Sequence, residues 1–145
     1  MNVVGKKRKI GKKGSIFRKK VTRGVPVGAH ISITDNSGAK VAKVIGVMGL
    51  KNVLRRLPAA AVGDVVVVAI QRGTPEMRKK LMTAILVRQK QPIHRVDGTR
   101  IVFEDNAAVI ISADGDPKGS NIRGPIAREA AELFPRVASI ASQII

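Results

Sequence analysis

The chain has 145 residues, enough for one domain with a single core, and it carries 27 Lys and Arg against 10 Asp and Glu, a formal net charge of +17. So much like charge repels itself unless a polyanion neutralises it, which indicates a nucleic acid or an anionic membrane surface as the partner. The sequence has no cysteine, no apolar run of about 18 residues and no signal-peptide core, so we expect a cytoplasmic protein without disulfides or thiolate metal sites.

The first 23 residues form a polycationic segment, because ten of them are Lys or Arg and the first acid of the chain is Asp35. Such a composition cannot bury enough apolar surface to fold alone, so it predicts an arm that becomes ordered on a polyanion. A solvated tail, an import signal and a membrane-surface tether are the alternatives. We therefore divide the chain into an arm over residues 1–23 and a single domain over residues 24–145. The phosphate contacts expected of the arm come from Lys6, Lys7, Arg8, Lys9, Lys12, Lys13, Arg18, Lys19, Lys20 and Arg23.

From residue 27 onwards, short apolar runs alternate with turn residues, which is typical of an all-β barrel or sandwich. The run "VGAHISIT" places Ile31 and Ile33 between polar neighbours, and "AKVAKVIGVM" follows it. Between them "DNSG" (35–38) supplies the residue types that favour a tight turn. We expect these two runs to pair as a hairpin.

The next two runs predict further strands. "VGDVVVVAI" (62–70) is apolar at successive positions, which indicates a strand buried on both faces. "LMTAILVRQK" (81–90) continues the pattern, and the segment "QRGTPEMRKK" (71–80) between them is a basic loop marked by Gly and Pro. Long cationic side chains on such a loop stand at the edge of a rigid body, where they can reach phosphates.

The segment "RIVFEDNAAVII" (100–111) places two acids side by side in a chain with few acids. We expect Glu104, Asp105 and Asn106 to form a tight turn between two strands, where short polar side chains bond to nearby backbone groups. Adjacent strand residues point to opposite faces, so these carboxylates cannot converge on one substrate bond as a hydrolase pair must. We expect no catalytic residues and no enzyme activity.

Other site motifs fail on spacing. His30 and His94 lack further ligands at metal-binding spacing, so we expect neither a metal nor a cofactor, although His94 stands beside Arg95 and could touch phosphate. "GVMG" (46–49) fits a KH-domain clamp, but it ends a predicted strand and does not join two helices. "GKKRKIGKK" (5–13) has the wrong glycine spacing for a phosphate-binding loop.

The aromatic content disfavours recognition of single strands by base stacking, because the chain has three Phe and no Tyr or Trp. What remains is recognition of phosphates and folded shape by Lys and Arg, which suits structured RNA or duplex DNA. The candidate contacts outside the arm are Lys51, Arg55, Arg56, Arg72, Arg78, Lys79, Lys80, Arg88, Lys90, Arg95, Lys118 and Arg123.

The C-terminal segment has helical spacing. Pro125 stands at a plausible first helical position, and Pro135 must end the helix or restart it, so we expect two short helices that cap the β domain. The face expected to be buried carries Ile126, Ala130, Leu133, Val137 and Ile140. The face expected to be displayed carries both charge signs, which suits protein contact better than RNA contact, and consists of Arg128, Glu129, Glu132 and Arg136. The alternative is that the helices only close the barrel.

Six segments, in their order and spacing, resemble the universal large-subunit ribosomal protein family numbered fourteen, in its archaeal and eukaryotic form. They are "ITDNSGAK" (33–40), "RLPAAAVGD" (56–64), "RGTPEMRKK" (72–80), "LVRQK" (86–90), "DGTRIVFEDNAAVII" (97–111) and "KGSNIRGPIAREAAELFPRVAS" (118–139). The resemblance implies a mainly β fold, with a small closed five-stranded barrel, a β-hairpin excursion and two short C-terminal helices.

The resemblance also implies a structural role in the large ribosomal subunit. The implied partners are large-subunit ribosomal RNA, neighbouring large-subunit ribosomal proteins, small-subunit ribosomal RNA at intersubunit bridges, and an anti-association factor that docks near the C-terminal helices. The arm is longer and more basic than in the bacterial form of the family, so its role is expected from charge alone. Charge by itself would equally allow a free-standing chromatin-like or RNA-chaperone protein.

Overall fold

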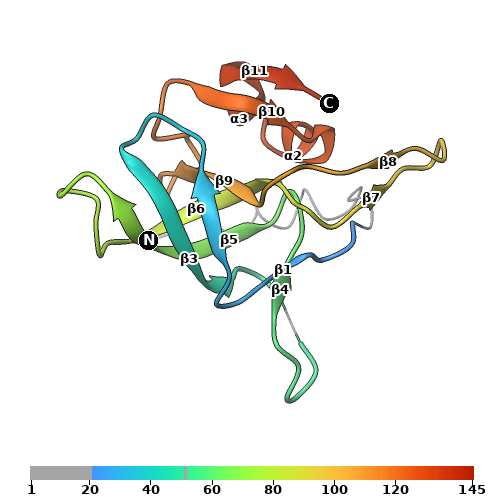
Figure 1. Cartoon of the computed structure of the whole chain (residues 1–145), viewed down its shortest axis with the longest axis horizontal. Coiled ribbons are helices and arrows are strands. Elements are labelled where there is room, and N and C mark those ends of the chain that lie inside the picture. Colours follow the sequence, from blue (N-terminus) through green and yellow to red (C-terminus); the bar gives the residue numbers. More distant parts are fainter. Residues whose placement is uncertain (1–20, 51) are drawn as a thin grey trace, which may run out of the picture.

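The computed structural model describes residues 21–50 and 52–145. Their centre is a closed barrel of five strands in the order β2-β3-β5-β6-β9 (Figure 1). Neighbouring strands are antiparallel, except that β2 and β9 close the barrel as a parallel pair. The predicted mainly β fold and its five-stranded barrel are confirmed. The barrel strands are β2 (His30–Ile33), β3 (Ala39–Val47), β5 (Val65–Gly73), β6 (Leu81–Arg88) and β9 (Ala107–Ile111).

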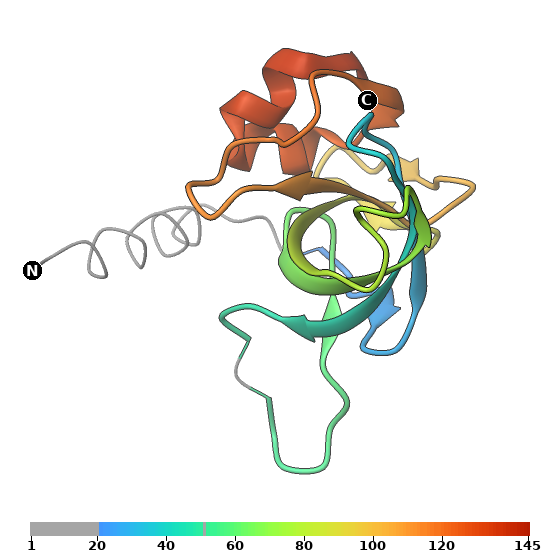
Figure 2. The ribbon, with the colours of Figure 1, turned by 90° about the vertical axis from the view of Figure 1, so that its left-hand side faces the viewer.

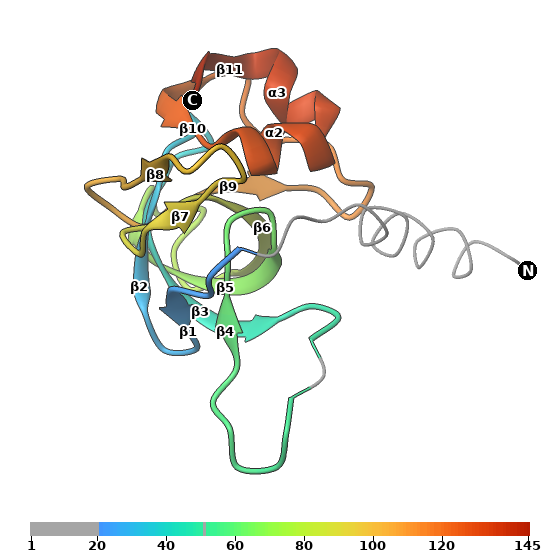
Figure 3. The same cartoon turned by 90° about the vertical axis from the view of Figure 1, so that its right-hand side faces the viewer.

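Shorter strands lie outside the barrel in two-stranded sheets. β7 (Ile93–His94) and β8 (Arg100–Ile101) form an antiparallel hairpin that projects from the barrel, as the resemblance implied (Figure 3). β1 (Val25–Pro26) pairs with β4 (Ala59–Ala60) beside the barrel. In the described part of the chain, no helix is long and apolar enough to cross a membrane.

The C-terminal residues 122–145 form a unit that we call the cap. It consists of β10 (Ile122–Ile126), α2 (Arg128–Leu133), α3 (Pro135–Ile140) and β11 (Ala141–Ile144), and it covers one side of the barrel (Figures 1 and 2). The two predicted short helices are confirmed, and Pro135 is the first residue of the second. Pro125 does not begin a helix, as the sequence had predicted, because it belongs to β10, which pairs in parallel with β11.

Two apolar clusters hold these parts together. The first fills the barrel with the inward side chains of its strands, such as Ile31, Val68 and Leu86. The second lies between the outer face of β6 and β9 and the cap, and it includes Ile85 and Val109. Outward side chains of the barrel are therefore apolar wherever the cap covers them, because burying apolar surface is the main favourable term in folding. Ile126, Ala130 and Val137 are buried as predicted, whereas Leu133 and Ile140 are half-buried.

The predicted hairpin at the start of the barrel is confirmed, because β2 pairs with β3 in antiparallel register, with Ile31 opposite Ala42. Its turn is stabilised by Asp35, whose Oδ1 accepts a hydrogen bond from the Ser37 backbone N–H at 3.1 Å. Gly38 follows with a φ of 100°, a left-handed conformation that favours glycine.

One other prediction about strands is wrong. β5 is not buried on both faces, because half-buried Val65, Val67 and Ala69 alternate with side chains that fill the barrel. Residues 104–106 lie in the connection between two strands as predicted, but these strands are not paired with each other, because β8 pairs with β7 whereas β9 pairs with β6 and β2. Glu104 and Asp105 therefore lie in the crossing from the β7–β8 hairpin into the barrel.

Candidate nucleic-acid interface

The connection between β5 and β6 displays cations because the segment beneath them is fixed to the barrel. Met77 is 5% exposed and packs into the barrel core. The Thr74 N–H donates a hydrogen bond to the Gly38 carbonyl at 3.0 Å. A Cβ atom at Gly73 would lie 2.6 Å from the same carbonyl oxygen, so the two segments approach this closely only because residue 73 is glycine. The exposed side chains held there are Arg72, Arg78, Lys79 and Lys80.

The loop between β3 and β4 extends away from the barrel and displays two more cations (Figure 2). Residues 52–57 are all exposed. The Arg56 N–H donates to the Val53 carbonyl at 3.1 Å, and the Asn52 side-chain amide donates to the Arg56 carbonyl at 3.1 Å. Arg55 has a φ of 67°, which non-glycine residues rarely adopt. The local hydrogen bonds thus bend the loop so that Arg55 and Arg56 face solvent beyond the barrel.

Acidic side chains in the barrel make structural hydrogen bonds to the backbone. Asp35 is 5% exposed, and its Oδ2 accepts a hydrogen bond from the Ile110 N–H at 2.9 Å. Asp64 is 7% exposed, and its Oδ2 accepts from the Ala61 N–H at 2.8 Å in the turn that precedes β5. A carboxylate that satisfies a buried N–H stabilises the fold and contributes little negative charge to the outer surface.

Asp97 has the same role in the turn of the β7–β8 hairpin. Its Oδ1 accepts from the Thr99 hydroxyl at 2.7 Å and from the Thr99 N–H at 3.1 Å. These hydrogen bonds favour the charged form and lower the pKa of Asp97 below its ordinary value of 3.8. The carboxylate fixes the turn that ends the projecting hairpin.

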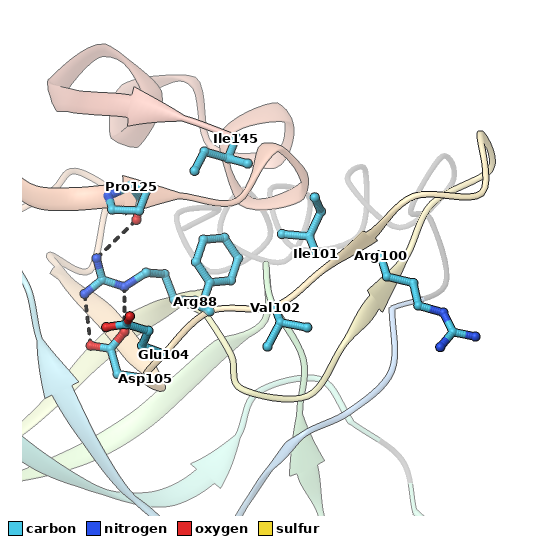
Figure 4. A pocket seen from close by; sticks show the side chains of 9 residues that line it. Arg88, Arg100, Ile101, Val102, Glu104, Asp105, Pro125 and Ile145 are labelled. Carbon is cyan, nitrogen blue, oxygen red and sulfur yellow. Dashed lines mark hydrogen bonds and ion pairs between the residues drawn. The ribbon is translucent and has the colours of Figure 1, made fainter.

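Arg88 is predicted by the sequence to contact RNA, but its side chain is only 10% exposed and lies between the barrel and the cap. Its Nη2 donates to Asp105 Oδ2 at 3.1 Å, and its Nη1 donates to the carbonyls of Arg123 and Pro125 at 3.2 Å each (Figure 4). Its Nε lies 3.1 Å from Asp105 Oδ1, in ion-pair contact but outside hydrogen-bond geometry. Because Arg88 fastens β10 to the end of β6, we exclude it from the RNA interface.

Arg95 has a second internal ion pair. Its Nε donates to Glu129 Oε1 at 3.0 Å, and its Nη2 donates to the Ile145 carbonyl at 2.7 Å. The Arg95 side chain is 12% exposed and the Glu129 side chain is 5% exposed. The prediction that Glu129 is displayed is therefore wrong. Helical periodicity allowed for burial against the barrel alone, whereas Arg95 of the β7–β8 hairpin meets a second side of α2.

The remaining predicted site residues are either exposed or lie outside the residues that the structure describes. Arg136 is exposed and forms an ion pair with Asp116, while Arg128 and Glu132 are exposed on the cap. The predicted RNA contacts at Lys51 and in the arm up to Lys20 lie outside the described residues. The predicted RNA contacts that are exposed are Arg23, Arg55, Arg56, Arg72, Arg78, Lys79, Lys80, Lys90, Lys118 and Arg123.

Sequence reasoning did not single out Lys40, Lys43 and Arg100, which are also exposed cations. Strict alternation along β3 would place Lys40 and Lys43 on opposite faces. A register shift in the β3–β5 pairing between Val41 and Ala42 accounts for the exposure of both. No local sequence signal marks this bulge.

An open groove of about 720 Å³ lies between the cap and the crossing from β8 to β9 (Figure 4). Its lining is apolar in the middle and charged at both ends, with Arg88 and Asp105 at one end and Arg100 at the other. Among the described residues, no group of three or more His, Asp or Glu side chains could hold a metal ion. The groove is lined by Arg88, Arg100, Ile101, Val102, Phe103, Glu104, Asp105, Pro125 and Ile145.

Residues 24–145 match the family model described as ribosomal protein L14p/L23e. The chain belongs to this family. It is 53% identical over 124 residues to the large ribosomal subunit protein uL14 of Picrophilus torridus, which covers 86% of this chain and 94% of that protein. It is 54% identical over 128 residues to the uL14 of Sulfurisphaera tokodaii, with 88% and 93% of the two chains covered. The uL14 of Thermofilum pendens is 52% identical over 132 residues, which cover 91% and 94%.

Family membership covers the barrel, the β7–β8 hairpin and the cap. The matched region contains the two internal ion pairs and the exposed cations of the β3–β4 and β5–β6 connections. The resemblance stated from the sequence is thereby confirmed. The family is structural and non-enzymatic, in agreement with the prediction that Glu104 and Asp105 are not catalytic.

Proposed function

We propose that this protein is a structural constituent of the large ribosomal subunit that binds ribosomal RNA through exposed Lys and Arg side chains. Membership of the uL14 family supports this function and a location in cytoplasmic ribosomes. The observation that carries the RNA interface is the local excess of exposed cations. Residues 52–58 and 71–80 display one exposed carboxylate, Glu76, against the exposed cations Arg55, Arg56, Arg72, Arg78, Lys79 and Lys80.

This local excess of cations favours a polyanionic partner for a physical reason. Each Lys or Arg that neutralises a phosphate releases a counterion, and an exposed carboxylate nearby would oppose that gain. Side-chain contacts of this kind read the backbone and shape of structured RNA without stacking on its bases. Phe103 is buried, so it offers no exposed ring for stacking.

Sedimentation in a magnesium-containing sucrose gradient tests the ribosomal function. We expect the tagged full-length chain to comigrate with large subunits. Its presence only in light or nucleoid fractions would overturn the proposal and would favour the free-standing basic nucleic-acid-binding protein. A free-standing basic protein could also adhere to ribosomes through charge. The sedimentation should therefore be repeated at raised salt, where an assembled subunit protein stays bound.

Charge reversal in the β5–β6 connection tests the RNA-binding surface. The variant Arg78→Glu with Lys79→Glu should enter large subunits less well, although its isolated fold still melts cooperatively, since both side chains are exposed. Lys79 has a φ of 62°, so Lys79→Gly is the control that keeps the backbone conformation and removes one charge without reversing it. Loss of the cooperative transition in the reversed variant would mean that these residues are structural.

We assign sequence-independent phosphate contacts to the arm, residues 1–23, on its charge alone. Deleting residues 1–20 removes nine cations from the chain. The salt dependence of RNA binding should become flatter, because the slope of log affinity against log salt scales with the number of phosphates neutralised. An unchanged slope would show that the arm does not contact RNA.

The exposed face of the cap is our candidate for contacts at the subunit interface, with small-subunit RNA at intersubunit bridges and with an anti-association factor. It carries Arg128, Glu132 and Arg136, and the open groove lies beside it. Reversing Arg128 and Glu132 together keeps the net charge and should weaken factor binding to isolated large subunits. Glu76→Lys, an exposed acid in the β5–β6 connection, is the control. If factor binding and subunit joining both stay intact, the helices serve only to close the barrel.

A further inference from the structure

Nine large hydrophobic side chains are exposed among the described residues, and they gather in three places. Val53, Leu54 and Leu57 accompany the cations of the β3–β4 loop, and Val96, Val102 and Ile144 lie on the β7–β8 hairpin, the crossing that follows it and the cap. The third group lies apart from the basic loops, the β7–β8 hairpin and the cap. It consists of Ile45, Met48 and Leu81, on and beside strands β3 and β6.

Strand register and exposure place Ile45 and Leu81 of this group on one outward face of the barrel. Val67 and Ala69 of β5 face outward, because the side chains between and beside them fill the barrel core. Ala69 pairs with Leu81 and Val67 pairs with Thr83 on β6. On the other side of β5, Ile45 follows Val44, which faces the core. We call the uncharged side chains of this face the outer strip, and they are Ile45, Val67, Ala69, Leu81 and Thr83.

The outer strip continues an apolar layer that the cap covers elsewhere. Val65 and Ile85 form the next outward-facing pair along β5 and β6, after Val67 and Thr83. Both belong to the cluster beneath the cap. The layer therefore runs from beneath the cap onto β5 and β3, where no described residue covers it: Leu81 is 68% exposed and Ile45 is 47% exposed. Surface of this kind on a rigid sheet marks an interaction site more clearly than isolated apolar residues do.

The chemistry of the outer strip selects a protein over RNA. Lys43 also lies on this face, at its edge, but between Ile45 and Leu81 the face exposes only Val67, Ala69 and Thr83, and the hydroxyl of Thr83 is the one side-chain hydrogen-bond donor of the strip. Phosphates pressed against such a surface would lose water without gaining a donor. The cations stand at its border, where Lys43 is paired opposite Ala69 and Lys80 precedes Leu81. An apolar segment flanked by carboxylates complements both the strip and its border.

We propose that the outer strip is a docking surface for an apolar, acid-flanked segment of a neighbouring protein in the large subunit. This inference rests on the proposed ribosomal function. The partner's apolar side chains cover Ile45 and Leu81, and its carboxylates reach Lys43 and Lys80. The strip thus divides the barrel surface, with RNA on the basic loops and protein on the uncharged sheet face between them.

Substitutions of opposite charge at Leu81 distinguish a protein contact from an RNA contact. Leu81→Glu and Leu81→Lys should both lower incorporation about tenfold in competition with the untagged wild-type chain, because either charge is desolvated in an apolar contact. An RNA contact would instead tolerate or favour the Lys variant. Val96→Glu and Val96→Lys are the matched controls, since Val96 is 97% exposed away from the strip. Thermal unfolding of each variant identifies any loss that comes from the fold itself.

A photo-crosslinking residue at position 81, with position 96 as the control, names the neighbour in assembled subunits. We expect an adduct at position 81 that survives ribonuclease and contains a ribosomal protein segment with apolar residues beside Asp or Glu. An RNA adduct, a protein segment without acids or no adduct at position 81 overturns the inference. If the chain enters large subunits but fails this test, only the inference falls; if it does not enter them, the proposed function falls as well.

Discussion

Removing Arg95 and removing Glu129 should lower the stability of the protein by different amounts, although the two residues form one ion pair. Arg95 projects from the β7–β8 hairpin with a side chain 12% exposed, and Glu129 lies on α2 at 5% exposure. Without Glu129, a long guanidinium near the surface can turn towards water. Without Arg95, the carboxylate on α2 stays buried without its charge partner. Removing one partner of a buried pair costs about 3–5 kcal/mol.

We therefore expect Arg95→Ala to lower the free energy of unfolding by about 3 kcal/mol, at the lower end of that range because the pair lies near the surface. Glu129→Ala should cost roughly half as much, since Arg95 regains water and loses mainly its hydrogen bonds. For a chain of this length, 3 kcal/mol corresponds to a fall of about 10 °C in Tm. Urea denaturation of the purified full-length protein, followed by far-UV circular dichroism, measures each value.

The double variant Arg95→Ala with Glu129→Ala decides whether the two residues act together. Its cost should be well below the sum of the single costs, by about 1–2 kcal/mol, because neither charge is left alone. The exposed pair of Arg136 with Asp116 is the control, and Asp116→Ala should cost less than about 1 kcal/mol. Additive single costs, or a larger loss at Glu129 than at Arg95, would refute this reasoning.

Three further outcomes are expected. Gly73→Ala should cost about 1–3 kcal/mol, because its Cβ would meet the Gly38 carbonyl at 2.6 Å, whereas Gly46→Ala on β3, with no neighbour within 4 Å, should be nearly neutral in unfolding experiments. Thr99→Val should raise the pKa of Asp97 towards 3.8 in an NMR titration; since this pKa is lowered on folding, its contribution to stability is lost as pH falls through the folded value. Phe103→Ala should cost about 3–5 kcal/mol in urea denaturation, because the ring is 7% exposed within the cluster beneath the cap.

The barrel could be predicted where its signals are local. The alternation around Ile31 and the turn at residues 35–38 specify the β2–β3 hairpin, because side-chain period and turn chemistry both act over a few residues. Pro135 marks the restart of a helix for the same reason. The β10–β11 pairing carries no such signal. Its partners, including Ile122 and Ala141, come together only after α2 and α3 have reversed the chain.

The candidate site was predicted less completely, because composition does not reveal which cations are paired inside the fold. Arg88 and Arg95 look like their exposed neighbour Lys90 in the sequence, and their partners Asp105 and Glu129 are 17 and 34 residues away. The role of each arginine is therefore set by a contact between segments that are far apart in the sequence. The separation between exposed and internal cations follows from the cap, since both internal arginines bond to residues or carbonyls that pack against it or belong to it.

The arrangement of acids gives the net charge its functional meaning. Asp35, Asp64 and Asp97 bond to turn or strand N–H groups, and Asp105 and Glu129 each neutralise an internal arginine. Asp35, Asp64 and Glu129 are buried, so an anionic partner approaching the basic loops meets cations whose field these three carboxylates oppose only weakly. Neutralising Glu129 raises the formal charge but removes the ion pair that holds Arg95 against α2, so we expect a less stable cap in a more cationic protein. Positive charge alone is therefore insufficient for the fold that presents the cations, because the cap depends on the acids paired with Arg88 and Arg95.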